Sequence, residues 1–345
     1  MEDDLPAVQL IEIATSSAPL TERARGLLEK LAEFVPSDAT WLALANPRSN
    51  VHTTVGSTGL DRPVLDYLER PAVAREIQLA GIKRASPPPS LVQLPIPADE
   101  LPTWSECLIP AGFHQGLGVP LSEPGGPYLG MLTLLFSRQP PSPAMRDRLS
   151  QLSPMIARGV SPMRSLLATA RLVRGATAGA LLYEDGTTYP LDGLQDHSLL
   201  AAASPVVAIA RKTLLAGHVY QSFMWPTRRV PASTTHMRIT VLAATEAPDF
   251  VLGALLLTPD ADCRGLTPRE LQVLGLLVDG RSNQQIATRL AVATRTVAAH
   301  VEHLLDKLGA PSRTLAAVLA EREGCYVPPL PGAPMRHDSC WVCPS

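Results

Sequence analysis

Soft metal-ligating side chains gather at the C-terminal end of this 345-residue chain. Cys340 and Cys343 form a CxxC pair, His337 stands three residues before it, and Cys325 lies upstream. These residues could hold zinc or an iron–sulfur cluster, or the CxxC pair could form a redox disulfide. A structural zinc site usually has two spaced ligand pairs around a folded unit, whereas this segment is rich in proline. A redox or metal sensor is therefore the alternative hypothesis, and we expect no cofactor.

Catalytic chemistry finds no support in the chain. No nucleophile can be matched with a base and an orienting group, and no pair of carboxylates suggests general acid–base catalysis. Cys107 and His114 are interpreted as a buried thiol and a surface imidazole. We expect that the protein is not an enzyme.

Basic residues concentrate in one stretch near the C-terminus. Between Arg281 and Arg313 five cations stand against Glu302 and Asp306, a local balance of +3 in a chain whose net charge is -2. Such a balance suits contact with phosphates, although the whole chain is not basic enough for a histone-like nucleic-acid binder. Any nucleic-acid surface must therefore be local.

Four short helical patterns position these residues. Thr267 and Glu270 form a capping box with Pro268 at the first helical position, and Ser282 with Gln285 forms another. A third helix is predicted from about residue 294 to 308, ended by Gly309, and a fourth from 312 to about 321. Two helices joined by a short link, the second longer and amphipathic, are typical of a helix-turn-helix.

The motifs in this stretch resemble the LuxR-type DNA-binding domain. They are Leu266-Thr267-Pro268-Arg269-Glu270, Gly280-Arg281-Ser282-Asn283-Gln284-Gln285-Ile286-Ala287, Thr296-Val297-Ala298-Ala299-His300 and Lys307-Leu308-Gly309. The resemblance implies a four-helix module whose third helix enters the major groove, and hence a dimeric transcriptional regulator acting on an inverted repeat. It also implies RNA polymerase as a partner.

Candidate functional residues follow from that resemblance and from helical spacing. The predicted DNA-binding residues are Asn283, Gln284, Gln285, Arg289, Arg295, Thr296, Ala298, Ala299, Glu302, His303, Lys307 and Arg313. The predicted dimerisation residues are Leu315, Val318 and Leu319. The metal candidates of the alternative hypothesis are Cys325, His337, Cys340 and Cys343.

The third helix departs from the family pattern at three positions. Family members often carry lysine where this chain has Ala298 and Glu302, so the exposed face is poorly basic. The usual Ser or Thr cap is Ala293, which weakens the helix start by about 1 kcal/mol unless Thr294 provides the cap. We expect modest DNA affinity with a steep dependence on salt.

Residues before 265 show alternating helices and hairpins. A helix over 20–34, strands over 40–45 and 51–55, a hairpin of 115–121 with 128–137, and a helix over 142–158 resemble a GAF-type sensory domain. A second unit, in which strand 237–244 pairs with 250–258, resembles a PAS-type or second GAF-like domain. The resemblance implies regulation by an unidentified small molecule or a protein partner.

The predicted fold class is therefore multidomain, with α+β GAF/PAS-like sensory domains followed by an all-α four-helix LuxR-type helix-turn-helix domain. The predicted boundaries are 8–160 for the GAF-like domain, 161–175 for a connecting helix, 176–260 for the PAS-like or second GAF-like domain, 264–323 for the helix-turn-helix domain, and 324–345 for a flexible Pro/Cys-rich tail.

Composition limits the remaining classes. Hydrophobic residues at 46% and charged residues at 18% indicate a folded chain rather than a disordered one. No apolar run is long enough to cross a membrane and the first residues are acidic, so we expect a soluble cytoplasmic protein without membrane contact. The chain also lacks a Walker loop and the acidic strand ends of a phosphoacceptor domain.

Overall fold

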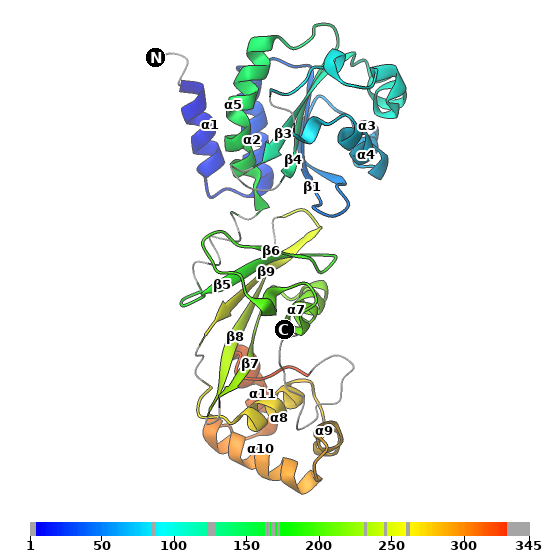
Figure 1. Cartoon of the computed structure of the whole chain (residues 1–345). Helices are drawn as coiled ribbons and strands as arrows, with labels where there is room; N and C mark the ends of the chain where they lie inside the picture. Colours follow the sequence, from blue (N-terminus) through cyan, green and yellow to red (C-terminus); the bar gives the residue numbers. More distant parts are fainter. Residues whose placement is uncertain are drawn as a thin grey trace. The chain divides into compact units, whose positions relative to one another are not determined.

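The computed structural model describes residues 5–84, 87–122, 128–162, 164, 166, 170, 173–230, 233–244, 247–259 and 263–329. The chain divides into two compact units, residues 1–165 and 166–345 (Figure 1). Within the described residues, no helix has both the length and the apolar character needed to cross a membrane. Within the predicted connecting helix, residues 162, 164, 166 and 170 are helical, and residues 163, 165, 167–169, 171 and 172 lie outside the described part of the chain.

The first unit is built on a four-stranded antiparallel sheet in the order β2-β1-β4-β3. The strands are β1 (Ala39–Ala45), β2 (His52–Thr58), β3 (Gln115–Ser122) and β4 (Tyr128–Phe136). Every residue of β1 is buried, since helices or turns cover both faces of the sheet. Both predicted hairpins are confirmed, but β1 also pairs with β4, a long-range contact that local sequence does not specify.

Two helices, α2 (Leu20–Ala32) and α5 (Pro143–Val160), cover one face of this sheet, and α1 (Leu5–Thr15) packs on both of them (Figure 1). The buried stripe of α2 comprises Leu20, Ala24, Leu27, Leu28 and Leu31, the spacing that predicted this helix. Ser142 caps α5 by accepting a hydrogen bond from the backbone N–H of Met145 at 3.2 Å.

The opposite face carries α3 (Arg62–Leu68), α4 (Pro71–Leu79) and a series of short turns (Figure 1). The turns are three 3₁₀ segments, Ile82–Arg84, Leu91–Gln93 and Ala98–Glu100, and one turn of π-helix, Thr103–Leu108. Helix α4 was not predicted from the sequence. Trp41, Val73, Ile77, Leu101 and Trp104 belong to the core on this side of the sheet.

The second unit begins with a five-stranded antiparallel sheet in the order β6-β5-β9-β8-β7. The strands are β5 (Ala178–Tyr183), β6 (Thr188–Pro190), β7 (Tyr220–Val230), β8 (Ser233–Ala243) and β9 (Val251–Thr258), and α7 (Pro205–Leu215) packs on β8 and β9. The predicted pairing of 237–244 with 250–258 is confirmed by the β8–β9 register, in which Ile239 faces Leu257. Strand β7 was not predicted.

Four helices complete the unit: α8 (Pro268–Val278), α9 (Asn283–Leu290), α10 (Thr294–Leu308) and α11 (Arg313–Glu323). They share one hydrophobic core with the five-stranded sheet, to which Phe223 and Trp225 contribute from β7 and Leu271 and Leu274 from α8. The middle region and the helical region therefore do not have separate cores.

Residues 325–327, here called the C-terminal strap, join the sheet to the helices. Cys325, Tyr326 and Val327 are all buried. The backbone N–H of Met224 donates to the carbonyl of Tyr326 at 2.7 Å, and the N–H of Val327 donates to the carbonyl of Leu271 at 3.1 Å. The proline- and cysteine-rich sequence from residue 324 onward predicts a flexible tail here. The structure differs because the strap lies between β7 and α8 and satisfies backbone groups of both.

Candidate nucleic-acid interface

Both predicted capping boxes are present in the helical region. The side chain of Thr267 accepts from the N–H of Glu270 at 3.3 Å, and the carboxylate of Glu270 accepts from the N–H of Thr267 at 2.7 Å. Ser282 and Gln285 make the equivalent pair of hydrogen bonds, at 2.9 and 3.3 Å. These local bonds set where α8 and α9 begin, as the sequence predicted.

The link between α9 and α10 is short and tightly held. Ala291 ends α9 in the left-handed conformation with φ of 52°, which glycine adopts more easily than alanine. Ala293 precedes α10, and no side chain caps that helix, so Thr294 does not replace the missing Ser or Thr cap. The start of α10 is therefore held by tertiary packing rather than by a cap.

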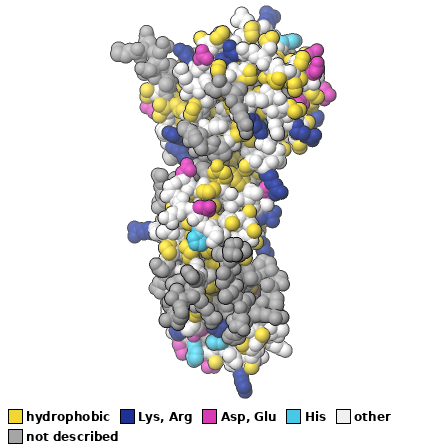
Figure 2. Space-filling view, in the orientation of Figure 1, with side chains coloured by type: hydrophobic (Ala, Val, Ile, Leu, Met, Phe, Trp, Pro, Cys, Tyr) yellow, Lys and Arg dark blue, Asp and Glu magenta, His cyan; other side chains and the backbone are white. Residues whose placement is uncertain are grey.

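Helix α10 presents a buried and an exposed face. Val297, Leu304 and Leu308 are buried against the neighbouring helices. Among the predicted DNA-binding residues of the helical region, Gln284, Gln285, Arg295, Thr296, Ala299, Glu302, His303, Lys307 and Arg313 are exposed, and Asn283, Arg289 and Ala298 are half-buried. Figure 2 shows acidic, basic and histidine side chains intermixed on the visible surface at the α10 end of this unit.

Arg295 is the cation on α10 best placed for an external anion. It lies in the first turn of the helix and is exposed. Within the described part of the chain, no hydrogen bond or ion pair is found for its side chain. Its guanidinium is therefore available to a phosphate or a base edge.

Lys307 has a different environment from the one its spacing suggested. Its ammonium group donates to the carboxylate of Glu270 at 2.7 Å and to the carbonyl of Gly265 at 3.0 Å. The Glu270 side chain is only 4% exposed, so its negative charge would be unfavourable there without the ammonium group of Lys307. Burial alone would raise the pKa of Glu270, but hydrogen bonds from Lys307 and Thr267 outweigh it and lower the pKa. Lys307 therefore joins α10 to α8.

Arg313 and Arg269 also make contacts within the module. Arg313 donates to the backbone carbonyl of Arg281 and, at 3.4 Å, to the side-chain oxygen of Asn283. Arg269, which sequence analysis did not select, donates to the carbonyl of Leu290 at 2.9 Å and thereby holds the end of α9. Its position in the helix-start motif was the available signal, but only the fold shows what it contacts.

The predicted dimerisation residues lie on α11. Leu315 and Val318 are 40% and 45% exposed, one helical turn apart, whereas Leu319 is half-buried and packs on the core. Leu315 and Val318 thus form an apolar surface without a cover in the described chain.

Of the four metal candidates, only Cys325 lies within the described residues. Cys325 is a buried free thiol whose pKa is raised, chiefly by burial. His337, Cys340 and Cys343 lie outside the described residues. In the described ranges no cluster of three or more His, Cys, Asp or Glu side chains could hold a metal ion.

Comparison with known proteins assigns the helical region. Residues 264–320 match the family described as "Bacterial regulatory proteins, luxR family". The chain is 40% identical over 89 residues to the nitrate/nitrite response regulator protein NarL of Escherichia coli K12, a match covering 25% of this chain and 41% of NarL. It is 52% identical over 56 residues to the DNA-binding transcriptional activator DevR/DosR of Mycobacterium tuberculosis, covering 16% of this chain and 26% of that protein.

The matches thus span less than half the length of these relatives. Among solved structures, the GAF domain of the Acinetobacter phosphoenolpyruvate-protein phosphotransferase is similar with a TM-score of 0.35 and 16% identity, covering 50% of this chain and 96% of that domain. The predicted LuxR-type helix-turn-helix domain at the C-terminus is confirmed.

Proposed function

We propose that this protein is a transcriptional regulator that binds double-stranded DNA as a homodimer, with α10 in the major groove of each half-site. The observation that carries the proposal is the family match over residues 264–320, together with an exposed α10 whose buried face is packed on α8 and α9. A helix held on one side and exposed on the other can enter the groove without disturbing the core. RNA polymerase as a direct partner and a cytoplasmic location are part of the same proposal, by resemblance to the family.

Within this proposal the DNA-facing residues divide into two groups. Arg295, Thr296, Ala299, Glu302 and His303 face the bases or the adjacent phosphates from α10. Gln284, Gln285, Asn283, Arg289 and Arg313 flank the groove from α9 and the start of α11. Lys307 acts mainly by holding α10 in place, since its ammonium group is bonded to Glu270.

The dimer contact is proposed to form through Leu315 and Val318 of α11. Two such surfaces facing one another across a two-fold axis bury apolar area in both copies. A two-fold dimer matches an inverted repeat in DNA, since the symmetry of the two partners then agrees.

Control is proposed to enter through the first unit, by a small molecule or a protein partner. The support is a mostly apolar pocket on the sheet of that unit, lined by residues of α4, β3 and β4. Activation and repression are both compatible with this arrangement.

Selection from genomic DNA fragments tests the DNA-binding function. The full-length protein is expected to enrich fragments that share one inverted repeat, and its affinity is expected to fall steeply as salt is raised.

Arg295→Ala is expected to weaken binding and to reduce the slope of log affinity against log salt by about 1, since one phosphate contact is lost. Arg322→Ala, a change at an exposed cation in the last turn of α11, is the matched control. Unchanged binding by the Arg295 variant would reject α10 as the reading helix.

A further inference from the structure

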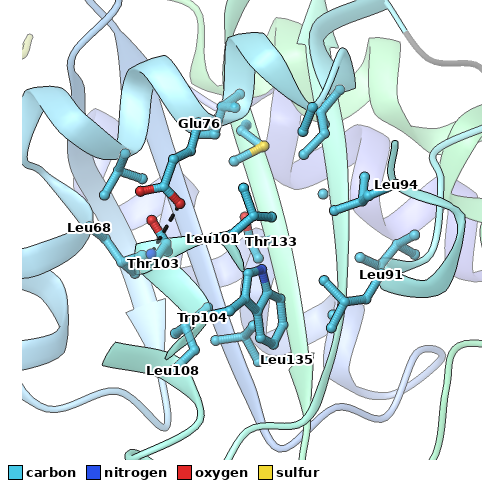
Figure 3. Close-up of a pocket in the computed structure, with 18 of the residues that line it drawn as sticks. Leu68, Glu76, Leu91, Leu94, Leu101, Thr103, Trp104, Leu108, Thr133 and Leu135 are labelled. Carbon is cyan, nitrogen blue, oxygen red and sulfur yellow. Dashed lines mark hydrogen bonds between the residues drawn. The ribbon is translucent and has the colours of Figure 1, made fainter. Parts of the chain in front are cut away.

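A mostly apolar pocket lies on the sheet of the first unit, under α4 and the turns that follow it (Figure 3). It contains about 670 Å³ of space not filled by atoms, part of which is open to solvent. Strand residues Trp41, Met131 and Leu135 line the sheet side, and Ile77 and Trp104 line the helical side. A mostly apolar lining with a few polar groups is typical of small-molecule sites in proteins.

Two glycines on β3 let side chains of the pocket wall approach the strand closely. A β-carbon on Gly116 would lie 2.6 Å from a ring carbon of Trp104. A β-carbon on Gly118 would lie 3.2 Å from side-chain atoms of both Ile82 and Met131. Glycine weakens a strand interior, and it commonly marks a place where another group approaches the backbone closely. The pocket therefore depends on residues that are unfavourable for the strand alone.

Polar groups are few, and they come from three different segments (Figure 3). The Glu76 carboxylate on α4 accepts from the backbone N–H of Thr103 at 3.0 Å. The hydroxyl oxygens of Thr103 and Thr133 are buried and have no hydrogen-bond partner among the described residues, and Thr103 is only 7% exposed. Glu76 likewise forms no ion pair with a described cation.

Thr103 also begins the turn of π-helix that ends at Leu108. This geometry is rare and is found frequently at functional sites, because it shifts side chains out of the ordinary helical register. Here the turn supplies both Thr103 and Trp104 to the pocket wall.

We propose that this pocket binds a small, mostly apolar molecule that carries a hydroxyl or amino group and no negative charge. The assignment rests on the ligand control proposed above and specifies its chemistry. A buried hydroxyl without a partner is unfavourable, and a ligand hydroxyl or amine would give the threonines and Glu76 a hydrogen-bonding partner. A carboxylate or phosphate would instead bring a second negative charge next to Glu76 in an apolar environment.

Three compounds with one skeleton test this chemistry. Binding of 4-phenylbutylamine, 4-phenylbutanol and 4-phenylbutyrate to the full-length protein is measured by isothermal titration calorimetry. The amine and the alcohol are expected to bind, and the carboxylate is expected to bind at least about tenfold more weakly. Equal or tighter binding of the carboxylate would overturn the proposal, and so would failure of both the amine and the alcohol to bind at millimolar concentration.

Glu76→Gln and Gly118→Ala locate the binding site. Glutamine keeps an oxygen that can accept from Thr103, so the fold is retained while the charge is removed, and the affinity for the amine is expected to fall about tenfold more than that for the alcohol. The methyl group added by Gly118→Ala is expected to lower the affinity for all ligands, because it narrows the pocket. Val92→Ala, at a side chain 79% exposed, is the control and is expected to bind normally. Normal binding by both pocket variants would place the ligand elsewhere.

DNA affinity measured with and without 4-phenylbutylamine separates this proposal from the DNA-binding function. Ligand binding in the calorimeter with unchanged DNA affinity would support the pocket and reject control by this ligand class. Intact DNA binding without any ligand binding would reject the pocket assignment alone.

Discussion

A β-carbon built on Gly275 of α8 would lie 1.8 Å from the carbonyl oxygen of Val327 in the C-terminal strap. Glycine at this position therefore allows the strap to lie directly on the helix. The side chain of Tyr326 in the strap also accepts a hydrogen bond from the side-chain amide of Gln221 on β7 at 2.9 Å, and Arg238 on β8 donates to the carbonyl of Glu323 at the end of α11, just before the strap. The strap thus ties the DNA-binding helices to the sheet of the same unit.

Gly275→Ala is expected to lower the free energy of unfolding of the second unit by about 2 kcal/mol, although alanine favours helix formation. The reason is that the added methyl group meets backbone, which cannot move aside as a side chain can. Urea unfolding measures the change. Gly26→Ala is the control, since its methyl group would meet only the Ile13 side chain at 3.2 Å. Equal stability of wild type and Gly275→Ala would show that the strap does not pack on α8.

Lys307→Ala is expected to destabilise the helical region by about 2 kcal/mol, because it leaves the carboxylate of Glu270 buried without its cation. The expected loss of stability is smaller than for a fully buried ion pair, since the Lys307 side chain is 35% exposed. The pKa of Glu270 is lowered, so the pair stabilises the fold above the ordinary carboxyl range, and that stability is lost as the pH falls through the lowered pKa.

A double-mutant cycle with Glu270→Gln measures this coupling by urea unfolding at neutral pH. Additive effects of the two substitutions would show that the ion pair does not contribute. The cycle also separates lost stability from lost DNA contact in any Lys307 variant.

Glu302→Ala is expected to raise the affinity for DNA about three- to tenfold at low salt, because an exposed carboxylate on α10 opposes the phosphate field. Fluorescence anisotropy with a selected inverted repeat measures the change. Glu321→Ala, at an exposed carboxylate on α11, serves as the control. A fall in affinity confined to sites with cytosine at one position would show instead that Glu302 accepts a bond from that base.

Val318→Glu is expected to convert the proposed dimer to a monomer, because a charge would replace a 45% exposed apolar side chain within the proposed contact. Analytical ultracentrifugation measures the oligomeric state. Thr288→Glu, at an exposed polar residue of α9, is expected to leave the dimer intact. A dimer that persists in the Val318 variant would assign dimerisation to a different surface.

His52 is expected to make the first unit sensitive to acid. Burial, and to a lesser extent the charge of Lys83, lowers its pKa from 6.5 to about 4. The unfolded state therefore binds a proton between these values while the folded state does not. Stability is full above pH 6.5 and falls as the pH drops toward 4, by about 2 kcal/mol between about pH 7.5 and about pH 5.

Urea unfolding at these two pH values measures the effect. His52→Phe keeps a ring in the buried site but cannot titrate. In this variant, the difference in the free energy of unfolding between the two pH values is expected to shrink by about 2 kcal/mol. An unchanged difference would assign the acid sensitivity to other groups. The substitution also removes the hydrogen bond between His52 and Tyr128 at 2.8 Å, so stability at neutral pH is compared first.

Local signals in the sequence were sufficient for the helical region. Capping boxes at Thr267 and Ser282, glycine at 309 and regular apolar spacing act over a few residues, so the starts and ends of α8 to α10 could be predicted closely. The family motifs lie on the same elements, which is why the candidate DNA-facing residues could be named before the fold was known.

Long-range packing decided the rest. The strap residues Cys325 to Val327 stand directly before a proline-rich segment, which predicted a flexible tail, and only their fit between β7 and α8 buries them. Likewise, Lys307 has the spacing of a DNA contact, but the fold brings Glu270 from another helix within 2.7 Å of it. The pocket under α4 required segments from residue 41 to residue 135 to meet on one sheet. The sequence by itself determined the helical module and its class, because those signals are local. Only the tertiary structure decided the strap, the ion pair and the pocket, because contacts between residues far apart in the chain depend on the whole fold.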